Sequence, residues 1–234
     1  MVNFLGIMQN EWAGAQAFSS FDTYLAPFVK VDHLSYPEVK KCIEAFIYGV
    51  NTPSRWGTQA PFSNITLDWT GPDDLAELPA LVGGVEMDFK YKDCKKEMDM
   101  VNKAFIETMI EGDSNGRGFQ YPIPPYSITK DFDWSDTENN RLLFEMTAKY
   151  GTPYFSNYIN SDMQPSDVRS MCCRLRLDLR ELRKKTGGFF GSGESTGSVG
   201  VVTINMPRIA YLSANKDEFY ARLNHMMDIA ARSL

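Results

Sequence analysis

Segments with helical periodicity alternate with segments of strand periodicity along nearly the whole chain, and this alternation limits the folds open to it. Residues 35–50 place apolar side chains on one helical face, behind Ser35 as a cap and Pro37 in the first turn. Ile65 and Leu67 alternate with polar residues, which is the pattern of a strand. Strands that alternate with helices are typical of an α/β barrel or a parallel sheet, so α/β is the predicted fold class.

The same patterns predict the remaining elements. A helix pair or one long helix is expected at residues 5–25, further helices at 92–112, 136–150 and 219–230, and further strands at 154–159, 175–179 and 199–204. The first helical segment should end before Pro27, and Gly112 and Gly151 should end the next two helices. The prolines of residues 118–125 predict a strand end or an edge, because prolines do not fit inside a central ladder.

Composition excludes several classes of protein. The formal net charge is −6 and the basic residues are mostly scattered, which argues against a nucleic-acid polymer as partner. No stretch approaches the roughly 20 apolar residues of a membrane span, so no membrane association is expected. Residues 1–8 carry no positive charge before their apolar part and make a poor signal peptide, so we expect a cytoplasmic location. The length of 234 residues suits one large core, and a single domain is expected.

The cysteines and histidines do not form a metal-binding pattern. The four cysteines include no C-x-x-C pair, and the two histidines are far apart in the sequence; they are Cys42, Cys94, Cys172, Cys173, His33 and His225. Neither a metal site nor a disulfide framework is therefore expected. Cys42 and Cys94 fall on apolar helical faces, which predicts that both lie in the core.

Two short motifs admit a functional interpretation beside a structural one. The glycines of residues 191–197 (GSGESTG) could cradle a phosphate, but the segment lacks the P-loop ending, departs from dinucleotide-binding spacing and leads into a predicted strand, so a flexible turn is favoured. Cys173 taken alone is more often a small buried hydrophobe than a reactive thiol. Its setting between Arg169 and Arg174, just before a strand, favours presentation into a cavity, with Cys172 pointing the opposite way.

Four segments together carry a resemblance that none carries alone. They are residues 9–18 (QNEWAGAQAF), 51–64 (NTPSRWGTQAPFSN), 170–175 (SMCCRL) and 196–208 (TGSVGVVTINMPR). In this order they resemble the anaerobic, glycyl-radical ribonucleoside-triphosphate reductases. The resemblance implies part of a ten-stranded α/β barrel with a central finger loop, whose tip carries a radical cysteine. By motif match that cysteine is Cys173.

The resemblance also implies the chemistry. A thiyl radical at Cys173 would take the 3′ hydrogen of a ribonucleoside triphosphate, after which the 2′ hydroxyl leaves as water and the 2′ carbon is reduced. The family needs a glycyl radical, made by a radical-SAM iron–sulfur activating enzyme, and formate or a thiol protein as reductant. This chain is expected to bind no cofactor itself. Such intermediates require a dry, closed cavity, which a barrel interior provides.

Several polar residues are candidates for binding nucleotides. Loop position and chemistry suggest that five side chains contact the substrate, although each could equally be a structural hydrogen-bonding group: Arg55, Ser63, Asn64, Ser195 and Asn205. The start of the chain would lie near the dimer interface and the site for ATP and dNTP effectors. Lys30 could contact an effector phosphate there, or be a solvated surface lysine.

Parts of the family pattern have no counterpart in residues 1–234. These are the N-terminal ATP-cone, the upstream active-site cysteine, and the C-terminal glycyl-radical and zinc region. We therefore expect a central portion of the barrel that is inactive without the remaining reductase segments. Two alternatives stay open: one piece of a split reductase, and a remnant that binds nucleotides or dimerises without catalysis.

Overall fold

The computed structural model describes residues 1–11, 16–53, 60–161, 168–170, 176–178 and 202–233. The chain divides into two compact units, Met1–Ser192 and Gly193–Leu234, and each is described by itself. In the described part of the chain, no helix combines the length and apolar character that crossing a membrane requires.

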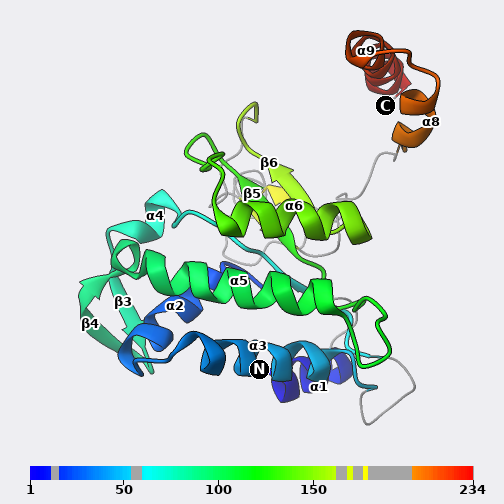
Figure 1. Ribbon diagram of the computed structural model, residues 1–234. Coiled ribbons are helices and arrows are strands. Elements are labelled where there is room, and N and C mark those ends of the chain that lie inside the picture. Colours follow the sequence, from blue (N-terminus) through cyan, green and yellow to red (C-terminus); the bar gives the residue numbers. More distant parts are fainter. Residues whose placement is uncertain (12–15, 54–59, 162–167, 171–175, 179–201, 234) are drawn as a thin grey trace. The chain divides into compact units, whose positions relative to one another are not determined.

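The first unit mixes helices and short strands (Figure 1). Its helices are α1 (Val2–Glu11), α2 (Phe21–Val31), α3 (Tyr36–Val50), α4 (Asp73–Ala76), α5 (Lys95–Glu111) and α6 (Glu138–Tyr150), with the 3-10 helix η1 (Tyr91–Cys94) before α5. Its strands are β1 (Gln16–Phe18), β2 (Ser63–Ile65), β3 (Pro79–Val82), β4 (Val85–Lys90), β5 (Pro125–Ile128), β6 (Tyr154–Asn157), β7 (Val168–Ser170) and β8 (Arg176–Asp178). The second unit contains α8 (Met206–Tyr211) and α9 (Lys216–Ser233).

Parallel strand pairs form the centre of the first unit. β1 pairs with β2, and β5 pairs with β6, both in parallel. Two isolated parallel bridges, Asn64 to Ile123 and Leu67 to Tyr126, join β2 to the segment that contains β5. The strands therefore follow the order β1, β2, β5, β6. This parallel arrangement with intervening helices agrees with the predicted α/β fold class.

Helices pack beside these strands around one large apolar core. α5 packs against α2, α3 and α6, and Figure 1 shows it between α3 and α6. Fully buried side chains of α3, α5 and β5, including Ile47, Phe105 and Tyr126, belong to the same core cluster. The burial of so much apolar surface stabilises strands that are only three or four residues long.

The helix ends follow the signals in the sequence. Ser35 and Glu38 form a capping box at the start of α3, in which the Ser35 N–H donates to Glu38 Oε2 over 2.8 Å. Gly112 and Gly151 end α5 and α6 with positive φ angles of 77° and 68°. Glycine accepts this backbone conformation without the steric cost that a side chain would add, so both predicted helix ends are confirmed.

The helical segment predicted at residues 5–25 contains a helix pair, as one of the two alternatives had it. The prediction that it ends before Pro27 was wrong. α1 and α2 are separated by β1, and α2 continues through Pro27 to Val31. A proline inside a helix removes one backbone hydrogen bond and costs about 3 kcal/mol. Pro27 is buried and α2 packs against α5, so tertiary packing offsets this cost.

Two further predictions fail. Cys42 is exposed, because the buried face of α3 is formed by Val39, Ile43 and the residues aligned with them, and Cys42 lies at its margin. Cys94, in contrast, is buried as predicted. Within the strand expected at 199–204, residues 202–204 are not in a strand and residues 199–201 lie outside the described residues. An apolar run alone does not specify a strand unless another strand pairs with it.

Candidate functional site

Two of the predicted substrate contacts lie next to each other in β2. Ser63 and Asn64 are both fully buried. The Ser63 carbonyl accepts a hydrogen bond from the Ile123 N–H over 2.9 Å, and Ile65 N–H donates to the Ile123 carbonyl over 3.0 Å. Within the described part of the chain, Ser63 Oγ has no hydrogen-bond partner. A buried hydroxyl normally has one, so this atom is suited to a polar group of a ligand.

Asn205 has a structural role in the second unit. Its Oδ1 accepts a hydrogen bond from the Arg208 N–H over 2.9 Å, which caps the N-terminus of α8. Asn205 belongs to the second compact unit, whereas Ser63 and Asn64 belong to the first. Arg55 and Ser195 lie outside the described residues, and their assignment stays a prediction.

Cys173 also lies outside the described residues, but the strands that flank it in the sequence are described. β7 and β8 pair antiparallel, with Ser170 opposite Arg176. This register leaves five residues, 171–175, to connect the two strands, and Cys173 is the third of them. The strands that precede and follow the predicted radical cysteine in the sequence are therefore paired with each other.

Lys30 borders a cavity of about 740 Å³ between α2, α3 and α5. Its Nζ donates to the Asp93 carbonyl over 3.0 Å, lies 3.9 Å from Glu97 Oε1, and lies 5.5 Å from the centre of the Phe89 ring. These contacts hold the ammonium group at the cavity, and its side chain keeps 34% of its surface exposed. Lys30 is therefore ordered by its neighbours and still accessible to a ligand.

Lysines outnumber carboxylates in the lining of this cavity. Besides Lys30, the lining includes Lys96 and Lys103, against the single carboxylate of Glu97. Lys103 is partly neutralised by two carboxylates, Glu138 at 2.6 Å and Glu107 at 3.9 Å. Its Nζ lies 5.1 Å from the centre of the Tyr36 ring. Clustered cations in a concave surface attract anions such as phosphates.

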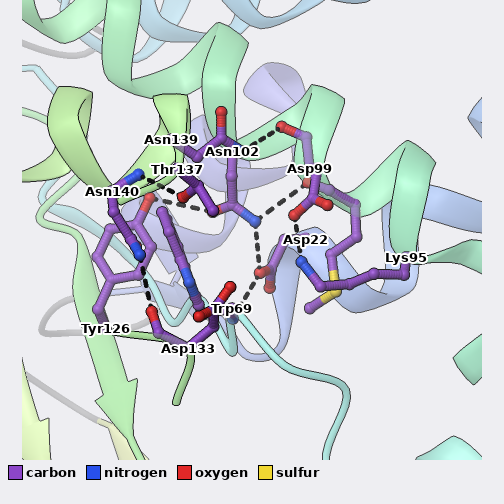
Figure 2. Close-up of polar contacts among 11 residues, drawn as sticks. Asp22, Trp69, Lys95, Asp99, Asn102, Tyr126, Asp133, Thr137, Asn139 and Asn140 are labelled. Carbon is purple, nitrogen blue, oxygen red and sulfur yellow. Dashed lines mark hydrogen bonds and ion pairs between the residues drawn. The ribbon is translucent and has the colours of Figure 1, made fainter. Parts of the chain in front are cut away.

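A buried polar network joins α2, α5, β5 and the chain after β2. The Asp22 carboxylate accepts hydrogen bonds from the N–H groups of Asp68 and Trp69 and from Asn102 Nδ2, each over 2.9 Å. Tyr126 donates its hydroxyl to Asn102 Oδ1 over 3.1 Å. Figure 2 shows the Asn102 amide beside the Asp22 carboxylate. Every donor to Asp22 is neutral, so the network supports the carboxylate by hydrogen bonds alone.

Asp68 adds a second buried carboxyl group to this network. Thr23 donates its hydroxyl to Asp68 Oδ2 over 2.6 Å. Burial, and then the neighbouring Asp22 carboxyl, raises the pKa of Asp68 to about 7. Burial likewise raises the pKa of Asp22, against hydrogen bonds that lower it. Because the two carboxyl groups interact, ionisation of one opposes ionisation of the other.

A second cavity of about 440 Å³ lies at the carboxyl ends of β5 and β6 and beyond β2. Asp68, Ser127, Lys130 and Tyr158 are among its lining residues. Among the residues that the structure describes, no three histidine, cysteine, aspartate or glutamate side chains come together as metal ligands would. The cavity therefore remains a polar recess without an assigned ligand.

Sequence reasoning missed the Asp22 and Asn102 network. Asp22 lies between Phe21 and Thr23 in an otherwise apolar helical stripe, and a charged residue in such a stripe is an indication of a buried polar site. Asn102 interrupts the apolar face of the helix at 92–112 in the same way. Their partners are 46 to 80 residues away in the sequence, so the pairing itself was not visible.

The fold is α/β, with two parallel strand pairs, and it contains a cavity lined by three lysines between α2, α3 and α5. The family model of the anaerobic ribonucleoside-triphosphate reductases matches residues 1–234. The chain belongs to this family, whose members are oxidoreductases.

Known relatives agree with this assignment. The anaerobic ribonucleoside-triphosphate reductase of Haemophilus influenzae is 24% identical over 250 residues, which cover 94% of this chain and 31% of the relative. The anaerobic ribonucleotide reductase of Thermotoga maritima, solved with citrate in the active site, shares the fold with a TM-score of 0.50. It is 22% identical, with 69% of this chain and 29% of that chain covered. This chain thus spans about a third of the length of these relatives.

Proposed function

We propose that this chain forms the central part of the catalytic barrel of an anaerobic ribonucleotide reductase, which reduces ribonucleoside triphosphates to 2′-deoxyribonucleotides. The family match over residues 1–234 supports this function. The observation that supports it is the antiparallel pairing of β7 and β8, with Ser170 opposite Arg176. In the sequence, Cys173 is the third of the five residues between these two strands. A finger loop that bears a radical cysteine at its tip needs this topology.

In the proposed reaction, the Cys173 sulfur as a thiyl radical takes the 3′ hydrogen of the ribose, so an S–H bond forms and a C–H bond breaks. The two bonds are close enough in strength for the transfer to be reversible. The 2′ hydroxyl then takes up a proton and leaves as water, and formate or a thiol protein supplies two electrons to the sugar. Cys173 finally returns the hydrogen to the 3′ carbon, which restores the thiyl radical.

The remaining parts of the reductase supply what this chain does not. A glycyl radical, generated by an activating enzyme, would provide the unpaired electron that Cys173 receives. The residues proposed to hold the ribonucleotide are Arg55, Ser63, Asn64, Ser195 and Asn205. Ser63 has the strongest support, because its buried hydroxyl has no hydrogen-bond partner among the residues that the structure describes. Asn205 already caps α8, so its contact with substrate has the weakest support.

The cavity beside Lys30 is proposed to take the triphosphate of an ATP or dNTP effector. Its volume of about 740 Å³ lies within the roughly 300–1,000 Å³ of small-molecule sites, and its lysines complement phosphate charge. We also propose that two copies of the chain associate, with the α2 and α3 side near the interface. Exposed apolar side chains on α2, Tyr24, Phe28 and Val31, support a contact surface there.

Reconstitution tests the proposed function. The chain is combined with the flanking segments of a family member, its activating enzyme and formate or a thiol reductant, and deoxyribonucleotide formation is measured under anaerobic conditions. Turnover should require all parts, and the chain alone should give none. Turnover by the isolated chain would contradict the account. Nucleotide binding without turnover in the complete mixture would favour a non-catalytic binding module instead.

A further inference from the structure

We propose that Asn51 is a positioning residue that fixes Ser63 for contact with the ribonucleotide. The inference rests on the proposed function, because Ser63 is there a substrate contact. Asn51 itself is half-buried at the C-terminal end of α3, and it reaches Ser63 through a segment of chain rather than directly.

The Asn51 side chain binds two separate parts of the chain. Its Nδ2 donates to the Ile47 carbonyl over 2.8 Å and to the Tyr121 carbonyl over 2.6 Å. Its Oδ1 accepts from the N–H groups of Gln120 and Tyr121, both over 3.1 Å. An asparagine amide offers two donor hydrogens and an acceptor oxygen with two lone pairs, so Asn51 uses its whole capacity. It locks residues 120–121 to the last turn of α3.

The same segment then pairs with β2. Two residues after Tyr121, the Ile123 N–H donates to the Ser63 carbonyl over 2.9 Å, and the Ile123 carbonyl accepts from Ile65 N–H over 3.0 Å. The rings of Tyr121 and Phe62 add a contact with 5.2 Å between their centres. Residues 120–123 therefore form a strap, held by Asn51 at one end and by β2 at the other.

This strap controls where Ser63 lies relative to α3. Along the chain, residues 52–62 separate Asn51 from Ser63. The strap links the same two residues by hydrogen bonds, because Tyr121 binds Asn51 and Ile123 binds Ser63. Ser63 Oγ is buried without a partner in the described residues, so its usefulness to a ligand depends on its position. A hydroxyl displaced by about 1 Å loses much of its hydrogen-bond energy, because the interaction depends steeply on distance and angle.

The test compares Asn51→Ala with the matched control Asn139→Ala in the full chain. Asn139 Nδ2 donates to the Asp99 carbonyl over 3.0 Å, so the control also removes an asparagine side chain that binds backbone, but between α6 and α5. Hydrogen exchange of the Ile65 and Ile123 amides reports the strap, CTP titration reports ligand binding, and urea unfolding reports global stability.

Asn51→Ala should speed exchange at both amides by about tenfold or more and weaken CTP binding by about tenfold, whereas Asn139→Ala should change neither more than about twofold. Both variants should lose stability to a similar extent. Unchanged exchange in Asn51→Ala would overturn the inference. So would faster exchange with unchanged CTP affinity, because Asn51 would then be only structural.

The two proposals fail in distinguishable ways. If the unmodified chain binds no CTP, the proposed contact of Ser63 with substrate is refuted. Asn51 then has no substrate contact to position, and the measured exchange rates do not change that conclusion. If the unmodified chain binds CTP and Asn51→Ala binds it equally well, the proposed function stands and only the role of Asn51 is refuted.

Discussion

Among single residues, Asp22 and Asp68 stand out because both are carboxylic acids in the core. Their burial would be costly without partners, and hydrogen bonds from neutral donors on three elements offset that cost. The pair connects the first turn of α2 to the chain that follows β2. The raised pKa of Asp68, about 7, gives this connection a dependence on pH.

The chain should be more stable in mild acid than in mild base. The pKa of Asp68 rises on folding from 3.8 to about 7, so the folded state binds its proton more tightly. The free energy of unfolding should therefore fall as pH increases between these values and stay low above them, by on the order of 1 kcal/mol per pH unit at the steepest. Urea unfolding at pH 5.5 and pH 8, values chosen as roughly either side of this pKa, measures the difference.

Asp68→Asn provides the control for this pH dependence. The amide keeps an oxygen that can accept the Thr23 hydroxyl and carries no charge at any pH. Its stability should change less between the two pH values, and the remaining change should come from Asp22, whose pKa burial also raises. Glu107 and Asp113 have lowered pKa values, so they change the stability of the chain only at pH values below this window. They therefore do not affect the comparison between pH 5.5 and pH 8, which lie roughly either side of the Asp68 pKa. An equally large fall in the asparagine variant would assign the effect to another group.

At the scale of elements, α2, α3 and α5 form one packed group that carries both the basic cavity and the Asp22 network. Lys30 and Asp22 are on α2, and Lys103 and Asn102 are on α5. Both features depend on the packing of α5 against α2 and α3. The basic cavity and the Asp22 network, which includes the chain after β2, therefore share helices α2 and α5.

Replacing Lys30 by alanine should weaken dATP binding to the chain by about tenfold, since one charge-assisted phosphate contact is worth roughly 1.5–3 kcal/mol. Equilibrium dialysis at fixed salt measures the affinity. Lys41→Ala is the matched control, because Lys41 is an exposed lysine of α3 that does not line the cavity. Equal affinities of the two variants for dATP would refute the assignment of the effector site to Lys30.

The sequence predicted long helices better than strands. α3, α5 and α6 have caps, stops and apolar stripes that act locally, and their ends were found within a few residues. β1, β2, β7 and β8 are three residues long, too short for a periodic signal, and their pairing depends on neighbours remote in sequence. The position of Pro27 inside α2 was not predicted for a related reason. A proline is tolerated there because α2 packs against α5, and that contact is not visible in the local sequence.

The site residues were proposed from motifs rather than from geometry, and their contact with substrate stays a prediction. The sequence placed Ser63 and Asn64 in the loop before a strand, whereas both lie buried within β2. Asn51 was part of that motif without being recognised as a positioning residue. Its partners at residues 120–121 are 69 and 70 positions away, and no local pattern reveals such a contact.

At the scale of the whole molecule, the chain belongs to the anaerobic reductase family and spans about a third of its relatives. It contains the β7 and β8 hairpin, the proposed ribonucleotide contacts of β2 and the basic cavity. We propose that Cys173 is the residue of this chain that attacks the ribose.

The most direct test replaces Cys173 by serine in the reconstituted reductase and compares it with Cys172→Ser. A serine O–H bond is too strong for the hydrogen transfer, so Cys173→Ser should lower deoxyribonucleotide formation by about a thousandfold or more. Cys172→Ser should keep turnover within about tenfold, because its role is expected to be packing. Unchanged turnover in Cys173→Ser, or a loss confined to Cys172→Ser, would contradict the account.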